Sequence, residues 1–161
     1  MKKFESYSEE YLKQVDNDEF EKIYIQIRRK QVLKTIYKYP HKSILEIGCG
    51  LDPFFNHFNE FKEYVIIEPE KAFIDNAKSL AKGNENIFFV NGKIQDRLED
   101  LIDYKFDFII LSSLLHEVKY PDEILKSIYK LSNKNTIIYA DVPNIYSLHR
   151  LLGMDIGILK N

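Results

Sequence analysis

Two closely spaced glycines and a carboxylate stand directly after short apolar runs of the sequence. Gly48 and Gly50 follow the first run, and Glu68 follows the second, 18 positions beyond Gly50. Glycines let the backbone turn sharply and let a ligand approach without meeting a Cβ. In dinucleotide-binding folds, an acidic residue about 20 positions after such a turn hydrogen-bonds the ribose hydroxyls. The spacing therefore predicts a site for a ligand that contains a nucleoside.

Each of these residues also has a purely structural interpretation. The two glycines make a tight turn without a ligand, with Asp52 as the N-cap of the next helix and Pro53 at its first position. Glu68 is then a solvated cap. The glycine turn upstream favours the ribose role for Glu68.

Further candidates follow the later apolar runs. Asn91-Gly92-Lys93-Ile94 stands after the third run, where Ile94 would lie against the face of a base. His116 follows the fourth run and His149 the fifth, and either is a candidate general base or substrate donor. A structural role for His116 is nearly as well supported. The two histidines have no third partner in the sequence, so no metal site is predicted.

A parallel sheet is needed to bring these residues together. The expected strands are 44–47, 64–67, 87–90, 106–111 and 136–142, and the expected helices between them are 69–81, 95–102 and 122–131. Strands that alternate with helices predict right-handed crossovers, and nearly all-apolar strands indicate that both faces are covered. Ligands in such a fold bind beyond the carboxyl ends of the strands, near the switch in strand order.

Residues 1–42 have a different pattern and are expected to form an N-terminal helical arm, with the α/β domain over 43–161. A helix is expected from a capping box at Asp18 and Glu21 to a stop at Pro40. Its apolar residues fall into two sets on different sides of the helix. The helix therefore either bends near Arg29 or is packed against other elements on both sides. The cluster Arg28-Arg29-Lys30 is interpreted as a solvated helix face. The arm is a candidate lid over the ligand.

Composition limits the classes of protein that fit. The 161 residues suffice for one domain, with 45% hydrophobic and 30% charged residues and a net charge of −2. That charge gives no global attraction to nucleic acid or an anionic membrane. The single cysteine excludes an internal disulfide, and no signal peptide or membrane-length apolar run is visible. A soluble cytoplasmic protein is expected, and its oligomeric state is not predicted.

Two nucleotide ligands share the glycine turn and the acidic residue. The dinucleotide fingerprint has a third glycine three positions after the second, but Pro53 stands at that position here. Glu46, two positions before the first glycine, would repel a pyrophosphate and would attract the ammonium of a methionine moiety. An NAD-dependent reductase is therefore disfavoured against a domain that binds S-adenosylmethionine.

The order of motifs is similar to that of the class I S-adenosylmethionine-dependent methyltransferases. Residues 44–50 (ILEIGCG) look like the first motif of that family, followed by 66–69 (IIEP), 89–92 (FVNG) and 106–110 (FDFII). Residues 116–118 (HEV) and 142–144 (VPN) resemble its small-molecule members. The likeness covers about Ser43 to His149.

The resemblance implies a three-layer, Rossmann-like, doubly wound fold with a mostly parallel sheet of about five strands. It implies S-adenosylmethionine as cofactor, S-adenosylhomocysteine as product, and O- or N-methylation of a small molecule with His116 or His149 as base. The implied cofactor residues are Glu46, Gly48, Cys49, Gly50, Glu68, Pro69, Gly92, Lys93, Ile94 and Ser112. A non-catalytic or regulatory module that binds the cofactor is the alternative.

The chain departs from the family in three places. Asp52 stands where the family often has another glycine, and Lys93 stands where it commonly has an aspartate. The 19 residues after Val142 leave no room for the family's final strand hairpin, so we expect either a truncated chain or a reduced fold.

Overall fold

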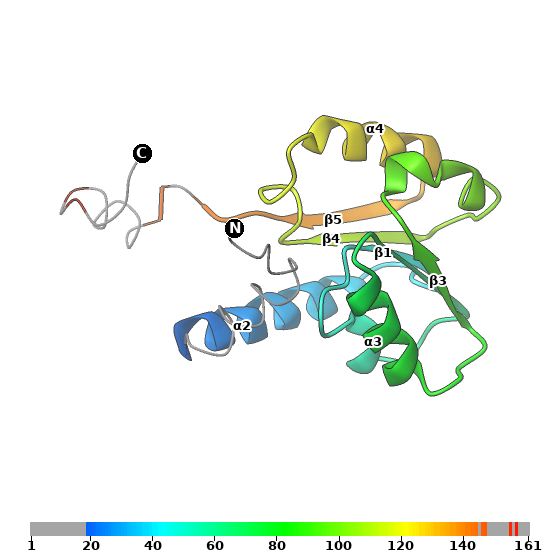
Figure 1. Cartoon of the computed structure of the whole chain (residues 1–161), viewed down its shortest axis with the longest axis horizontal. Coiled ribbons are helices and arrows are strands. Elements are labelled where there is room, and N and C mark those ends of the chain that lie inside the picture. The colour runs from blue at the N-terminus through cyan, green and yellow to red at the C-terminus, as the bar shows by residue number, and fades with distance from the viewer. Residues whose placement is uncertain (1–18, 145, 148–154, 156, 158–161) are drawn as a thin grey trace, which may run out of the picture.

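The fold is a five-stranded parallel sheet covered on both sides, as the computed structural model describes for residues 19–144, 146–147, 155 and 157 (Figure 1). The strand order is β3-β2-β1-β4-β5, and every pairing is parallel. The strands are β1 (Ser43–Ile47), β2 (Glu63–Glu68), β3 (Ile87–Asn91), β4 (Phe108–Ser112) and β5 (Ile137–Asp141). The doubly wound, three-layer architecture expected from the sequence is confirmed.

The helices form the two outer layers. Helices α2 (Glu19–Ile36) and α3 (Lys71–Ala81) lie on one face of the sheet, and α4 (Pro121–Leu131) lies on the other (Figure 1). Three short 3₁₀ helices complete the described elements: η1 (Phe54–Asn56), η2 (Ile94–Asp96) and η3 (Leu98–Asp100). None of the described helices is both long enough and apolar enough to cross a membrane.

Alternate residues of each central strand enter opposite halves of the core. Ile44, Ile66 and Ile110 pack on the side of α2 and α3, whereas Leu45 and Ile109 pack on the side of α4. All five are fully buried. Burial on both faces explains why the strands read as continuous apolar runs, and it fixes the pairing register, since a one-residue slip would exchange the two faces.

The expected helix over 95–102 is wrong. The segment instead forms η2 and η3, which are separated by Arg97 with φ −126° and ψ 22°. The Arg97 side chain turns back toward Gly92 and pairs with Asp100, with 2.7 Å between Nε and Oδ2. Of the apolar residues of the expected helix, Leu101 is still fully buried, whereas Ile102 is 53% exposed.

The expected helix start at Pro53 is also wrong. Only the three-residue η1 follows, and the Asp52 side chain does not cap it. That carboxylate instead contacts Arg29, Asn56 and His57. The Asp52 carboxylate therefore binds Arg29 of α2 and two residues of the η1 turn, in place of the expected capping hydrogen bond.

Helix α2 runs without interruption, and only its second apolar set enters the core. Val32 and Ile36 are fully buried, whereas Ile23 and Ile27 are 56% and 50% exposed. Of the two expected alternatives, the one in which the helix is packed on both sides is therefore wrong. The first half of α2 lies toward the carboxyl end of the sheet (Figure 1).

The burial of the central strands predicts a clear difference between the losses of stability caused by two isoleucine substitutions. Ile110→Ala, in the middle of β4, should lower the free energy of unfolding by about 3 kcal/mol because it leaves a cavity between packed layers. Ile102→Ala, at a 53% exposed site, should change it by less than about 0.5 kcal/mol. Urea unfolding followed by circular dichroism measures both. Equal losses would contradict this description of the core.

Candidate functional site

The turn after β1 is shaped by two glycines with positive φ. Gly48 has φ +75° and Gly50 has φ +55°, values that favour glycine. A Cβ on Gly48 would approach Leu114 Cδ1 to 3.1 Å, whereas a Cβ on Gly50 would meet nothing within 4 Å. The turn therefore packs tightly at its first glycine and leaves open space beside its second.

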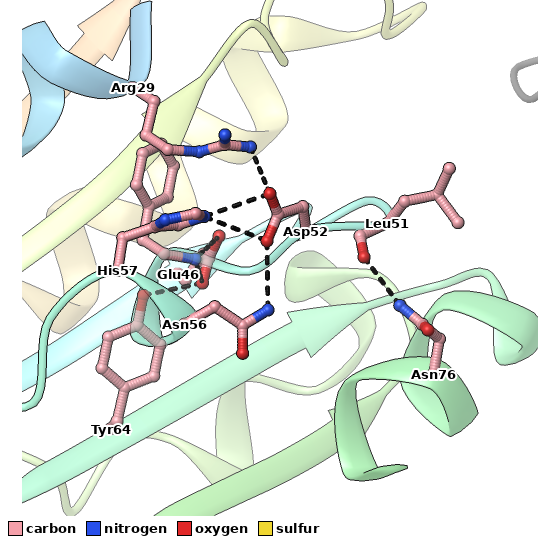
Figure 2. Close-up of polar contacts among 9 residues, drawn as sticks. Arg29, Glu46, Leu51, Asp52, Asn56, His57, Tyr64 and Asn76 are labelled. Atoms are coloured by element: carbon pink, nitrogen blue, oxygen red, sulfur yellow. Dashed lines mark hydrogen bonds and ion pairs between the residues drawn. The ribbon is translucent and has the colours of Figure 1, made fainter. Parts of the chain in front are cut away.

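Polar side chains from two helices hold the segment that follows the glycines (Figure 2). Arg29 of α2 pairs with Asp52, with 2.5 Å between NH2 and Oδ2. Asn56 Nδ2 and His57 Nε2 each lie 3.0 Å from Asp52 Oδ1. Asn76 of α3 donates its amide N–H to the Leu51 carbonyl at 2.7 Å. The turn is thus fixed from both sides before any ligand arrives.

Glu46 supports the turn from inside the protein. The residue is 2% exposed, and its carboxylate accepts a 2.6 Å hydrogen bond from the Tyr64 hydroxyl and longer ones, 3.3 Å, from the Phe54 N–H. Burial raises the pKa of Glu46 to about 8, although these hydrogen bonds oppose the rise. Both carboxylate oxygens therefore already have protein donors.

Glu68 ends β2 with its carboxyl group turned toward the glycine turn. It is 5% exposed, and Oε1 accepts the Glu70 N–H at 2.9 Å. Burial raises the pKa of Glu68, and hydrogen bonds from the backbone N–H groups of Glu70, Gly50 and Cys49 oppose that rise. A buried acceptor group thus lies next to the backbone of the two residues where the sequence predicts a sugar.

A cavity of about 340 Å³ lies at the carboxyl ends of β1, β2 and β3. It is lined by Ile47, Gly48, Ile67, Pro69, Gly92, Lys93, Ile94, Gln95, Leu114, Val118, Lys119, Tyr120 and Ile124. This volume is within the usual range for small-ligand sites, and apolar side chains predominate. Open backbone at Gly50, a buried carboxylate at Glu68 and an apolar cavity fit the parts of a nucleoside cofactor.

The structure brings together some of the predicted residues and separates others. Five of them line the cavity: Gly48, Pro69, Gly92, Lys93 and Ile94. Cys49, Gly50 and Glu68 meet at the adjoining turn. Burial holds the pKa of the Cys49 thiol well above its usual range, so the cysteine is not a reactive nucleophile. Sequence reasoning did not assign Leu114, Val118, Lys119 and Tyr120 to the site. These lining residues lie in the segment after β4 on either side of the predicted His116, which was the available signal.

A second polar cluster lies at the ends of β4 and β5. The Asp141 carboxylate accepts the Ser112 hydroxyl at 2.8 Å, together with the N–H and hydroxyl of Ser113 at 2.8 and 3.0 Å. Arg28 donates to the Ser113 hydroxyl, and Ser113 has φ +54°. The prediction that residues 28–30 form a solvated face is therefore wrong for Arg28 and Arg29, which bind loops beyond α2. Lys30 is exposed as expected.

The structure describes His116, one of the two candidate general bases, and not the other. The His116 side chain is 33% exposed and lies outside the cavity lining, with Nε2 3.6 Å from Glu117 Oε1. His149 is outside the described residues. Across the part of the chain that the structure describes, no three potential metal ligands gather.

A family profile described as "Methyltransferase domain" matches residues 21–161 of this chain. No curated protein matches its sequence. Among solved structures, the N-methyltransferase NodS from Bradyrhizobium japonicum WM9, in complex with S-adenosyl-L-homocysteine, has a TM-score of 0.57 and 21% identity. The match covers 73% of this chain and 58% of NodS.

Two further structures share the fold. A methyltransferase from Thermotoga maritima, described as S-adenosylmethionine-dependent and a possible histamine N-methyltransferase, has a TM-score of 0.61 at 20% identity, over 80% of this chain and 56% of that one. The [4+2]-cyclase SpnF has a TM-score of 0.57 at 16% identity, over 70% and 42%. The chain thus spans only about half of the length of such structures.

The buried Glu46 carboxyl predicts a pH dependence of stability. Its pKa in the folded chain, about 8, is above its ordinary value of 4.5, so the folded state keeps a proton that the unfolded state has lost. The resulting stabilisation is full below the ordinary pKa and is lost as the pH rises to about 8. Relative to Glu46→Gln, the wild type should lose about 1 kcal/mol of unfolding free energy per pH unit in this window.

Urea unfolding between about pH 5 and pH 8 measures this difference. Glu60→Gln, at an exposed site, is the matched control and should follow the wild type. Parallel wild-type and Glu46→Gln curves would show that Glu46 does not titrate in this window.

Proposed function

The chain belongs to the family of methyltransferase domains, and on that premise we propose that it transfers the methyl group of S-adenosylmethionine to a small-molecule acceptor. One observation carries the proposal. The buried Glu68 carboxylate faces the open glycine turn next to an apolar cavity. This is the set of surfaces that a sugar, an amino-acid chain and a base require.

Each part of the cofactor has a matching group in the chain. Glu68 would accept the ribose hydroxyls, and the backbone of residues 48–50 would line the sugar and methionine portions. Ile94 would pack against adenine in the cavity, with Pro69, Gly92 and Lys93 around it. When bound, S-adenosylmethionine supplies an activated methyl group and leaves as S-adenosylhomocysteine.

Two predicted contacts take a modified form in this proposal. Glu46 already binds Tyr64 and Phe54, so we assign it the support of the turn and not the methionine ammonium. Ser112 keeps its predicted role, a backbone contact with the methionine end, since its hydroxyl is held by Asp141. The amide of Gln95 takes the place of the missing aspartate beside the base, because Lys93 carries no acceptor.

The protein's main contribution to catalysis would be positioning. Holding the donor and acceptor in a near-attack geometry lowers the barrier by several kcal/mol without covalent help. The first half of α2, which lies toward the carboxyl end of the sheet (Figure 1), would help to exclude water. For a hydroxyl or ammonium acceptor, the neutral imidazole of His116 or His149 would remove the proton.

A second candidate function is cofactor binding without methyl transfer. The similarity in fold to a [4+2]-cyclase shows that this architecture also serves another reaction. The two functions differ in whether methyl groups reach any acceptor. A panel of small hydroxyl and amine compounds with labelled S-adenosylmethionine separates them.

Replacing Glu68 tests the cofactor site directly. Glu68→Gln should weaken binding of S-adenosylhomocysteine at least about tenfold, since hydrogen bonds to a charged acceptor are lost. Isothermal titration calorimetry measures the affinity, and urea unfolding confirms that the variant is folded. Glu60→Gln, at an exposed position, should bind like the wild type.

Failure of the wild type to bind either S-adenosylmethionine or its demethylated product would overturn the proposal. Binding of NAD in their place would instead favour the NAD-dependent reductase, which Pro53 and Glu46 disfavour.

Substitution of His116 tests the proton-transfer role. With an acceptor identified by the panel, His116→Gln should lower kcat about a hundredfold and leave the affinity for S-adenosylhomocysteine unchanged. His149→Gln is measured in parallel. His41→Gln, whose imidazole lies 2.6 Å from the Tyr39 carbonyl before β1, is the control. Full activity of both the His116 and His149 variants would remove histidine from the mechanism.

A further inference from the structure

We propose that Arg29 and Asp52 are positioning residues for the glycine turn, and that their ion pair keeps the turn in its ligand-binding conformation. The inference rests on the proposed function, since the ligand it concerns is the cofactor of the methyltransferase site. It assigns a role to an arginine that sequence reasoning placed on a solvated face. Figure 2 shows the pair and its neighbours.

The pair joins an element fixed in the core to Asp52, the exposed residue at the end of the turn. Val32, one helical turn after Arg29, is fully buried, so the backbone of α2 at this point is anchored. The Arg29 side chain is only 19% exposed, against 41% for Asp52. Partial burial strengthens a charge-assisted contact relative to a free surface pair.

Asp52 collects more than one donor. Asn56 and His57 approach the carboxylate from the η1 side, each at 3.0 Å, and Arg29 approaches from α2. Two of these donors are local to the turn, whereas Arg29 is 23 positions away in the sequence. Of these three donors, Arg29 is the one that belongs to α2, so this contact ties the position of residues 48–52 to that of the helix.

The turn needs such a tie because of its glycines. Gly50 has φ +55°, and a side chain there would meet open space, so at Gly50 itself no side-chain packing opposes a change of conformation. Glycine also loses more backbone entropy on ordering than other residues. A turn that is competent only part of the time would weaken ligand affinity in proportion to the competent fraction.

The neighbouring arginine makes a matching tie across the site. Arg28 donates to the Ser113 hydroxyl in the loop after β4, and the next residue in that loop, Leu114, packs against Gly48. Strands β1 and β4 are adjacent, and the strand order reverses between them. Helix α2 therefore holds both loops that border the switch point, where ligands bind in such folds.

The test measures the affinity for S-adenosylhomocysteine by isothermal titration calorimetry. Arg29→Met and Asp52→Asn should each raise the Kd about five- to thirtyfold, the range typical of coupling between linked sites. The Kd of the double variant should be no higher than those of the single variants, because both substitutions break the same ion pair. Arg29→Lys, which keeps the charge, should recover most of the affinity.

Lys71→Met is the matched control. It breaks the Lys71–Asp75 pair, which has a similar 2.6 Å separation but is exposed and joins two residues of the same helix, α3. Its Kd should equal that of the wild type. Unchanged Kd values in Arg29→Met and Asp52→Asn, or independent and additive losses, would overturn the proposal.

Amide hydrogen exchange in the ligand-free protein separates this inference from the proposed function. The N–H groups of residues 48–52 should exchange faster in Arg29→Met and Asp52→Asn than in the wild type or Lys71→Met. If the wild type binds no S-adenosylhomocysteine, the proposed function fails, and exchange rates alone decide the role of the pair. Equal exchange rates in all four proteins would refute it.

Discussion

The rest of this site depends on keeping an exposed backbone turn in place beside buried carboxyl groups. Residues 48–52 turn sharply after β1 with glycines at positive φ, and Glu46 and Glu68 lie beneath and beside them with almost no contact with solvent. A buried carboxylate is costly unless it is hydrogen-bonded. The donors that satisfy both groups include backbone N–H groups of the turn and of η1. The turn and the carboxyl groups therefore stabilise each other.

The core explains why this arrangement can persist. Strands β1, β2 and β4 are buried on both faces, and their register fixes where each strand ends. Glu46 and Tyr64 belong to neighbouring strands and meet at 2.6 Å because that register places them on the same face. Helices α2 and α3, which lie on the same face of the sheet (Figure 1), then contact the loop after β1 through Arg29 and Asn76. The site inherits its geometry from the packing of the layers.

Family membership and site geometry point to the same chemistry at different levels of detail. The family profile matches residues 21–161, and the cavity and Glu68 supply the features that a cofactor with a base and a sugar requires. The structural relatives share the fold at 16 to 21% identity and include enzymes described with different activities. Under the proposed function, the acceptor would be set by the elements that cover the candidate cofactor site, and α2 is a described element that contacts the two loops flanking it.

The sequence by itself determined the strands, the covering of both faces of the sheet and the positions of Gly48, Gly50 and Glu68 relative to the strands. These features follow from local patterns: apolar runs with both faces buried, glycines after a strand, and a carboxylate after the next. The 3₁₀ turns at residues 94–100, the partners of Asp52, and the roles of Arg28 and Arg29 were decided only by the tertiary structure. Those contacts join positions 23 and 85 residues apart. An arginine on a helix is indistinguishable from a solvated one until packing determines which loop lies opposite it, because its charge finds a partner only once the core has placed both elements.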